Sequence, residues 1–210
     1  MKLIFLGPPG AGKGTLAALI AETYNLPHIA TGEIFRKAIS DKSPLGVKVQ
    51  AMIDNGQLVG DELTIELVKE RLAQEDVKNG FILDGFPRTI PQAVALEDIL
   101  KCDWAVNFSV TDQLIIKRLS GRRICSQCKR NYHIEFMPPG KTGVCDGCGG
   151  ELITRAEDRM DSISRRLEIY RSQTEPLIAH YRTKKILVDI DASSASGVVL
   201  ERFQELFPRI

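Results

Sequence analysis

The feature that most constrains this chain is a glycine-rich turn near its start, Gly7-Pro8-Pro9-Gly10-Ala11-Gly12-Lys13-Gly14-Thr15. An apolar run precedes the turn, and apolar residues recur at helical spacing from position 16. Such a turn from a strand into a helix presents backbone N–H groups to an anion, and the helix N-terminus adds partial positive charge. Lys13 lies where an ammonium meets the β- and γ-phosphates, although Gly14 replaces the usual hydroxyl residue and the hydroxyl follows at Thr15. The alternative is a surface turn with an ordinary lysine, but the flanking strand and helix favour a nucleotide-phosphate site.

Five short apolar runs alternate with stretches of helical spacing along the chain. Helices between parallel strands make right-handed crossovers, so this alternation predicts a parallel sheet. We expect an α/β fold of the P-loop NTPase type, a five-stranded parallel sheet with helices on both faces. The expected strands lie at residues 3–6, 26–30, 81–83, 104–110 and 186–190. Because ligands bind at the carboxyl ends of such strands, the loops at 7–15, 84–88 and 191–194 should converge.

Several helix boundaries can be read between these strands. Residues 31–59 contain two short helical patterns separated by Ser43-Pro44, and Thr31 is a candidate cap for the first. Asp61 is expected to cap the next helix. Pro176 lies inside a run of helical spacing over 163–181 and should kink or stop that helix.

Asp84 follows the third apolar run and opens the segment Asp84-Gly85-Phe86-Pro87-Arg88. An acid at the carboxyl end of a buried strand is where nucleoside triphosphatases hold magnesium, often through water. The alternative is that Asp84 caps a loop. With the phosphate loop in the same sheet, the magnesium interpretation is favoured, and we expect Mg²⁺ to arrive with ATP.

Four of the five cysteines form two C-x2-C pairs with sixteen residues between them: Cys125, Cys128, Cys145 and Cys148. This spacing is typical of a closed, structural four-thiolate zinc site. Unpaired surface thiols and redox cysteines are the alternatives. His133 is expected to be an exposed loop residue rather than a ligand, because four thiolates already complete a tetrahedron. Cys102 reads as a near-core residue without a functional signal.

Composition limits the other possibilities. The chain has 210 residues, of which 43% are hydrophobic and 26% charged, as in an ordinary globular protein with one α/β core and one or two insertions. A net charge of +1 argues against general binding to nucleic acid or to membrane surfaces. No apolar run approaches 18 residues, so we expect neither a membrane span nor a signal peptide, and a cytoplasmic location.

Arginines lie on both sides of the cysteine-containing insert. Arg118, Arg122 and Arg123 precede it, and Arg155, Arg159, Arg165 and Arg166 follow it. This placement suggests a flap whose hinges bring positive charge onto a ligand. The alternative is a solvated helix face paired with Glu157, Asp158 and Asp161, and we expect that role for Arg123, Arg159 and Arg165.

The chain resembles adenylate kinases of the long-lid bacterial type over essentially its whole length. The resemblance is carried by the segments at 7–15, Ala30-Thr31-Gly32-Glu33-x-x-Arg36, Asp84-Gly85-Phe86-Pro87-Arg88-Thr89 with Gln92, Gly121-Arg122-Arg123, and Arg155 with Arg166-Leu167. It implies transfer of the terminal phosphoryl of MgATP to AMP, giving two ADP. It also implies a core (1–29, 60–121 and 160–210), a monophosphate-binding insert (30–59) and a zinc lid (122–159). We expect a monomer without nucleic-acid or membrane partners.

The resemblance also implies roles for particular residues. Lys13, Asp84, Arg88, Arg122, Arg155 and Arg166 would be catalytic. ATP would be bound by Gly10, Ala11, Gly12, Lys13, Gly14, Thr15, Arg118, Arg122, Asn131, Tyr132 and Ser194. AMP would be bound by Thr31, Arg36, Gln57, Leu58, Val59, Gly85, Phe86, Pro87, Arg88, Gln92, Arg155 and Arg166, with Gln92 reading the adenine edge. Cys125, Cys128, Cys145 and Cys148 would hold the metal.

Three positions depart from the family pattern: Ala30 replaces a serine, Glu157-Asp158 replaces Asp-Asp, and Asp191-Ala192 replaces Asp-Gly. The last change adds a Cβ beside the expected adenine contact.

Two alternatives to the adenylate kinase function remain. One is a kinase for UMP, CMP or GMP on the same fold, which Thr31, Gln92 and the long lid disfavour. The other is a zinc-ribbon adaptor with a degenerate nucleotide site, which the balanced charge of residues 124–154 disfavours.

Overall fold

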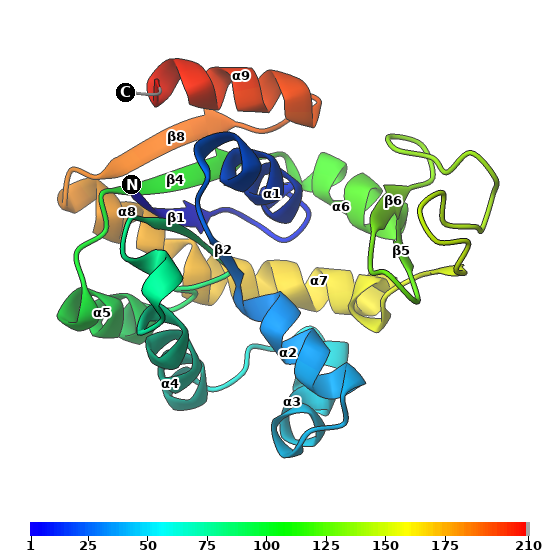
Figure 1. Ribbon diagram of the computed structural model, residues 1–210, viewed down its shortest axis with the longest axis horizontal. Coiled ribbons are helices and arrows are strands. Elements are labelled where there is room, and N and C mark those ends of the chain that lie inside the picture. The colour runs from blue at the N-terminus through cyan, green and yellow to red at the C-terminus, as the bar shows by residue number, and fades with distance from the viewer. Residues whose placement is uncertain (209–210) are drawn as a thin grey trace.

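A five-stranded parallel sheet forms the centre of the computed structural model, which describes residues 1–208. The strands follow the order β2-β3-β1-β4-β8 (Figure 1). Their bounds are β1 Lys2–Leu6, β2 His28–Ala30, β3 Phe81–Asp84, β4 Trp104–Ser109 and β8 Leu187–Asp191. All four strand pairs are parallel, which confirms the predicted fold class.

Alternate residues of β1 enter two separate apolar layers, as the two-residue period of a strand requires. Leu3 and Phe5 pack with residues of α1 (Lys13–Tyr24) and α9 (Ser196–Leu206) on one face of the sheet. Ile4 and Leu6 pack on the other face. The helices that cover this second face are α4 (Asp61–Leu72), α5 (Ile90–Ile99) and α8 (Pro176–Thr183). The central sheet is therefore buried on both sides (Figure 1).

Between β2 and α4, two helices form a small unit with an apolar centre of its own. They are α2 (Thr31–Ser40) and α3 (Pro44–Asp54). Ser43 caps α3 by accepting a hydrogen bond from the backbone N–H of Gly46. The expected caps elsewhere are wrong: α2 is preceded by Ala30 and α4 by Gly60, so Thr31 and Asp61 are the first helical residues.

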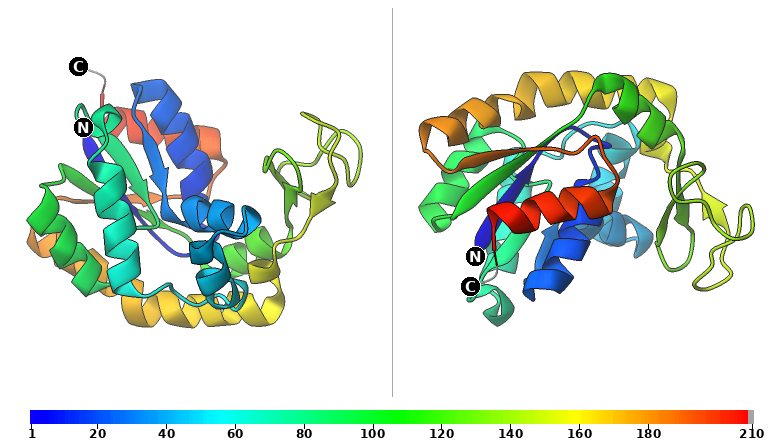
Figure 2. Two further views of the ribbon diagram at one scale, coloured as in Figure 1. Left: turned by 60° about the horizontal axis from the view of Figure 1, so that its bottom comes forward. Right: turned by 90° about the horizontal axis from the view of Figure 1, so that it is seen from above.

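The cysteine-containing insert follows α6 (Asp112–Ser120) and is built on a three-stranded antiparallel sheet. Its strands are β5 (Arg122–Cys125), β6 (Asn131–His133) and β7 (Leu152–Ile153). In both views of Figure 2 its loops stand away from the rest of the molecule. A short 3₁₀ helix, Ala156–Asp158, leads back to the core.

The return path is a long helical rod. It consists of α7 (Met160–Ile169), a π-helical turn over Tyr170–Thr174, and α8. Pro176 is the first residue of α8, where its missing N–H is tolerated. The predicted interruption at Pro176 is confirmed, and it takes the form of the preceding π-helical turn. A further short 3₁₀ helix, Glu75–Val77, precedes β3.

The expectation that His133 is an exposed loop residue is wrong. His133 ends β6 and is only 8% exposed. Its Nε2 donates to the carbonyl of Lys117 at 3.2 Å, because its Nδ1 accepts from the backbone N–H groups of Glu135 and Phe136 at 3.0 Å. The ring thus ties the end of α6 to the insert. Cys102, by contrast, is buried as expected.

Among residues 1–208, no helix combines the length and the apolar character that a membrane-spanning helix needs.

Candidate active site

The phosphate loop connects β1 to α1 at the carboxyl edge of the sheet (Figure 1). Gly10 and Gly12 adopt left-handed backbone conformations, with φ of 82° and 90°. A side chain at Gly7 would place its Cβ 2.6 Å from the carbonyl oxygen of Phe108. Lys13 Nζ donates to the carbonyls of Gly7 and Pro8, at 2.7 and 2.9 Å, so its ammonium lies across the loop.

Electrostatics distinguish Lys13 from a surface lysine. Burial lowers the pKa of Lys13 to about 8, against the opposing effect of Asp84, and the nearby positive charges of Arg88, Arg166 and Arg122 lower it further. Its ammonium therefore lies in a region that is already positive. Such a region favours a polyanionic ligand.

Asp84 ends β3 beside the start of α1. A Cβ at Gly14 would lie 3.4 Å from Asp84 Oδ2, and His28 Nε2 lies 3.4 Å from the same oxygen. Burial alone would raise the pKa of Asp84, but the hydrogen bond to His28 and the charge of Lys13 hold it below its usual value. The carboxylate is thus kept ionised close to the phosphate loop. The sequence patterns do not predict His28 as a partner of Asp84; the available signal is that His28 lies in an expected strand, two residues from its carboxyl end.

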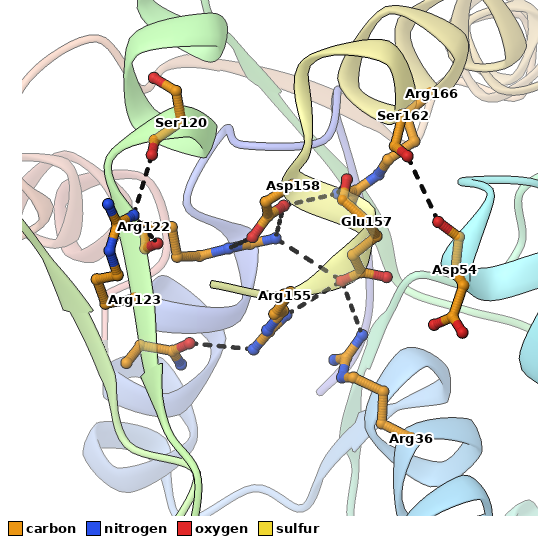
Figure 3. Close-up of polar contacts among 11 residues, drawn as sticks. Arg36, Asp54, Ser120, Arg122, Arg123, Arg155, Glu157, Asp158, Ser162 and Arg166 are labelled. Atoms are coloured by element: carbon orange, nitrogen blue, oxygen red, sulfur yellow. Dashed lines mark hydrogen bonds and ion pairs between the residues drawn. The ribbon is translucent and has the colours of Figure 1, made fainter. Parts of the chain in front are cut away.

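Four arginines from different segments converge on two acids of the 3₁₀ helix, Glu157 and Asp158 (Figure 3). Arg122 makes a two-pronged ion pair with Asp158, at 2.7 and 2.5 Å, and the Asp158 side chain is fully buried. Arg166 donates to Asp158 at 3.0 Å. Glu157 Oε1 lies 3.5, 3.7 and 3.4 Å from Arg36, Arg122 and Arg155. The guanidinium groups outnumber the carboxylates, so positive charge remains in excess.

This arrangement corrects the expected pairing of the arginines. Among the described residues, Arg123, Arg159 and Arg165 form no ion pair with an acid. Arg123 instead donates to the backbone carbonyls of Ser120 and Arg122, and the other two are exposed. Glu157 and Asp158 instead form their ion pairs with the predicted site arginines, Arg36, Arg122, Arg155 and Arg166.

The pKa values reflect the crowding of charge. Burial would raise the pKa of Glu157, but the surrounding guanidinium groups, with Arg166 the strongest, bring it down to about 2. Burial, aided by Arg122 and Arg36, lowers the pKa of Arg155 to about 10. Arg155 Nε is buried and has no hydrogen-bond partner within residues 1–208. A buried, unpaired donor of this kind is costly unless a ligand accepts from it.

Arg88 interacts electrostatically both with Lys13 and with Arg166 and Glu157 of this cluster. Its Nε donates to the carbonyl of Gly85 at 2.8 Å, and Gly85 has a φ of 80°. Burial and the charge of Arg166 lower the pKa of Arg88. Lys13, Arg88, Arg122 and Arg166 are thus close enough to perturb one another.

Two of the expected AMP-binding residues, Thr31 and Gln92, contact the segment at 85–88. Thr31 Oγ1 donates to the carbonyl of Gly85 at 2.8 Å. Val59 lines a cavity of about 450 Å³ together with residues of α3 and the start of α4. Gln92 is buried and engaged with Asp61 and with the backbone N–H of Arg88. Phe86 is fully buried in the core on the α4, α5 and α8 side of the sheet.

The expected ATP-binding residues are less uniform. Arg118 donates to the carbonyls of Ala11, Ser193 and Ser194, and it thereby links the phosphate loop to the loop at 191–194. Asn131 Oδ1 accepts from Arg155 Nη2 at 3.1 Å. The Tyr132 side chain is buried against Cys145, so the structure does not bring it to the phosphate loop.

The four cysteines of the insert come together. Their Sγ atoms all lie within 4.8 Å of one another, and two separations are 3.4 and 3.5 Å. The hydrogen bond with Tyr132 lowers the pKa of Cys145 to about 6. These four thiols could hold one metal ion. In contrast, burial raises the pKa of Cys102 to about 12, which keeps that thiol protonated.

Comparison with known proteins agrees with this geometry. Residues 5–186 match the family model described as "Adenylate kinase". The chain belongs to the adenylate kinase family. It is 57% identical over 208 residues to the adenylate kinase of Treponema denticola, covering 99% of this chain and 100% of the relative. Identity to the adenylate kinase of Clostridium tetani is 50% over 215 residues, covering both chains completely. The adenylate kinase of Clostridium perfringens strain SM101 is 48% identical over 206 residues, covering 96% of this chain and 95% of the relative.

Adenylate kinases are phosphotransferases whose acceptor is a phosphate group, and this chain is one of them. Nucleotides are therefore its substrates. The family uses Mg²⁺ with ATP, and the cysteine cluster is compatible with a second, protein-bound metal.

Proposed function

We propose that this adenylate kinase transfers the terminal phosphoryl group of MgATP reversibly to AMP, giving two ADP, and that the site residues act as follows. The observation that carries this assignment is the convergence of Lys13, Arg88, Arg122 and Arg166 beside the phosphate loop. Four positive side chains at one place suit a group whose charge is spread over several phosphate oxygens.

On the donor side, backbone N–H groups of residues 10–15 bind the ATP phosphates, and Lys13 contacts the transferred group. Lys13 already reaches across the loop to the carbonyls of Gly7 and Pro8, so it needs only to exchange these acceptors for phosphate oxygens. Arg118 stacks on the adenine, and the backbone at 131–132 and 194 borders it. The Arg118 contacts with both loops support this placement.

On the acceptor side, Arg36 and Arg88 bind the AMP phosphate, while Thr31 and residues 57–59 enclose the nucleoside. Gln92 reads the adenine edge. Two observations support this assignment: Val59 lines a cavity between α3 and the start of α4, and Asp61, which lines the same cavity, accepts a hydrogen bond from Gln92.

Transfer needs no general base, because the attacking phosphate oxygen is already ionised at neutral pH. The protein contributes position and charge neutralisation. Arg122, Arg155 and Arg166 close on the phosphoryl group from the lid side, and the unpaired Nε of Arg155 offers a donor that is not otherwise used.

The magnesium site fits the residues present. Carboxylate oxygens suit Mg²⁺, and Asp84 holds an ionised carboxylate next to the start of α1. Asp84 would hold the waters of the ion. When bound, Mg²⁺ supplies additional neutralisation of the phosphate charge.

The cysteine cluster fits structural zinc. A tetrahedral zinc about 2.3 Å from each sulfur needs sulfur separations of about 3.8 Å, close to those found. Four thiolates leave no open coordination position, so the metal would stabilise the lid fold and take no part in the chemistry. We further propose that the segments at 30–59 and 122–159 move relative to the core as AMP arm and lid.

An assay of ADP formation with AMP, UMP, CMP and GMP tests the proposed activity. We expect AMP to be strongly preferred, and turnover of UMP equal to that of AMP would overturn the substrate assignment. We also propose a monomer that does not bind nucleic acid. Sedimentation and salt-dependent DNA or RNA binding measurements test this, and salt-sensitive binding without ADP formation would support the adaptor alternative instead.

A further inference from the structure

The side-chain amide of Gln92 forms one hydrogen bond through its nitrogen and one through its oxygen, and each partner can act only as an acceptor or only as a donor. Its Nε2 donates to Asp61 Oδ1 at 2.8 Å, and its Oε1 accepts from the backbone N–H of Arg88, also at 2.8 Å. Gln92 is 1% exposed, so water does not compete for these bonds. The first contact joins α5 to the first residue of α4, and the second joins α5 to the loop that precedes it.

Neither partner can reverse its role. A carboxylate accepts and cannot donate, whereas a backbone N–H donates and cannot accept. Rotating the amide by half a turn would therefore place its oxygen against the Asp61 carboxylate and its NH₂ against the Arg88 N–H. Two hydrogen bonds would become two repulsive contacts in a buried site, so only one orientation of Gln92 is stable.

Thr89 reinforces this arrangement. Its hydroxyl accepts from the backbone N–H of Gln92 at 3.3 Å and donates its hydrogen to Asp61 Oδ1 at 3.0 Å. One carboxylate oxygen thus receives two donors, which fixes the position of Asp61. The same aspartate lines the cavity of about 450 Å³ beside Val59.

We propose that Asp61 is a positioning residue that makes the acceptor site selective for adenine over 6-oxopurines. With one bond made at each atom, the locked amide keeps one N–H and one lone pair for a base. Adenine offers an acceptor at N1 and a donor at its 6-amino group, which match this edge. Hypoxanthine and guanine offer N1–H and O6, which match only the rotated amide that Asp61 opposes. This inference rests on the proposed role of Gln92.

The test compares kcat/KM for AMP and for inosine monophosphate, which differ at this edge. Asp61→Asn keeps the shape but replaces the carboxylate by an amide that can itself rotate and donate. We expect the ratio of kcat/KM for AMP to kcat/KM for IMP to fall roughly tenfold or more, because one of the two contacts that disfavour the rotated Gln92 amide is lost. The KM for ATP should be unchanged. Glu66→Gln is the matched control, because Glu66 is exposed on the same helix, and its ratio should stay at the wild-type value.

A purely structural role for Asp61 would lower kcat/KM for AMP and IMP equally, and an unchanged ratio would overturn the proposal. Gln92→Leu separates this failure from failure of the proposed function. If Gln92→Leu loses the preference while Asp61→Asn retains it, only the Asp61 inference is wrong. If Gln92→Leu retains it, the assignment of Gln92, and with it the inference, is wrong.

A measurement on the wild-type protein does not depend on how the variants fold. In ¹⁵N-labelled enzyme, the side-chain amide proton of Gln92 that bonds to Asp61 should exchange slowly with solvent. Exchange as fast as that of a solvent-exposed glutamine amide would show that the amide is not held by Asp61 and would overturn the proposal.

Discussion

Replacing Glu157 by glutamine should lower the stability of the protein by about 3 kcal/mol at pH 7. The neighbouring guanidinium groups bring the pKa of Glu157 from its usual 4.5 to about 2. Each tenfold change in proton affinity corresponds to about 1.36 kcal/mol, which gives this figure for the charged carboxylate. For a protein of this size, the loss corresponds to a melting temperature lower by about 6–12 °C.

The pH dependence gives the sign of the effect. Because the pKa is lower in the folded state, the contribution of Glu157 is fully present above about pH 4.5 and is lost as the pH falls through about 2. The stability gap between wild type and Glu157→Gln should therefore narrow by half or more between about pH 5 and about pH 3.

Urea unfolding at several pH values measures this gap. Glu135→Gln is the matched control: Glu135 also pairs with a cation, Lys117, at 2.6 Å, but both side chains are more than half exposed. Such surface pairs contribute about 0–1 kcal/mol. Equal stability of the two variants at pH 7, or a difference from wild type that does not narrow with falling pH, would contradict the proposed contribution of Glu157.

Three further predictions concern the site and the lid. Because the pKa of Lys13 is about 8, kcat/KM for ATP should fall as the pH rises through about 8. The value of kcat should fall only at higher pH, because bound phosphates raise the pKa of Lys13 and keep it protonated. Values of kcat and kcat/KM that do not change up to about pH 10 would contradict this. Arg88→Ala should lower kcat by about 10³-fold or more without changing the melting temperature, because it removes a positive charge from the transferred phosphoryl group. Arg165→Ala is the control: Arg165 is exposed, and kcat should stay at the wild-type value. An unaltered kcat for Arg88→Ala would exclude a catalytic role for Arg88. Stripping the metal from the four cysteines with a chelator should lower the melting temperature measured by calorimetry, and an unaffected transition would exclude a structural metal.

The parallel sheet could be predicted because its strands are short apolar runs and its connections are helices, both of which are local patterns. The cysteine cluster could also be predicted, because the spacing of the two C-x2-C pairs is visible in the sequence. The phosphate loop combined both kinds of signal, a strand before it and a helix after it.

The sequence could not predict in the same way which polar side chains form hydrogen bonds and ion pairs with one another. Asp61 looked like a helix cap by the local rule, but its carboxylate serves a glutamine 31 residues further along the chain. Glu157 and Asp158 lie near several arginines in sequence, and only the three-dimensional arrangement selects Arg36, Arg122, Arg155 and Arg166. The burial of His133 could not be predicted locally either, because the carbonyl that it binds belongs to Lys117 in the helix before the insert.

The proposed phosphate-transfer site is tested most directly by a crystal structure of the protein with a bisubstrate analogue, two adenosines joined by a chain of phosphates. We expect the phosphates to be contacted by Lys13 and by the guanidinium groups of Arg88, Arg122, Arg155 and Arg166, with one adenine against Arg118 and the other against Gln92. A complex in which the phosphates bind elsewhere, or in which these side chains turn away from them, would contradict the proposed site.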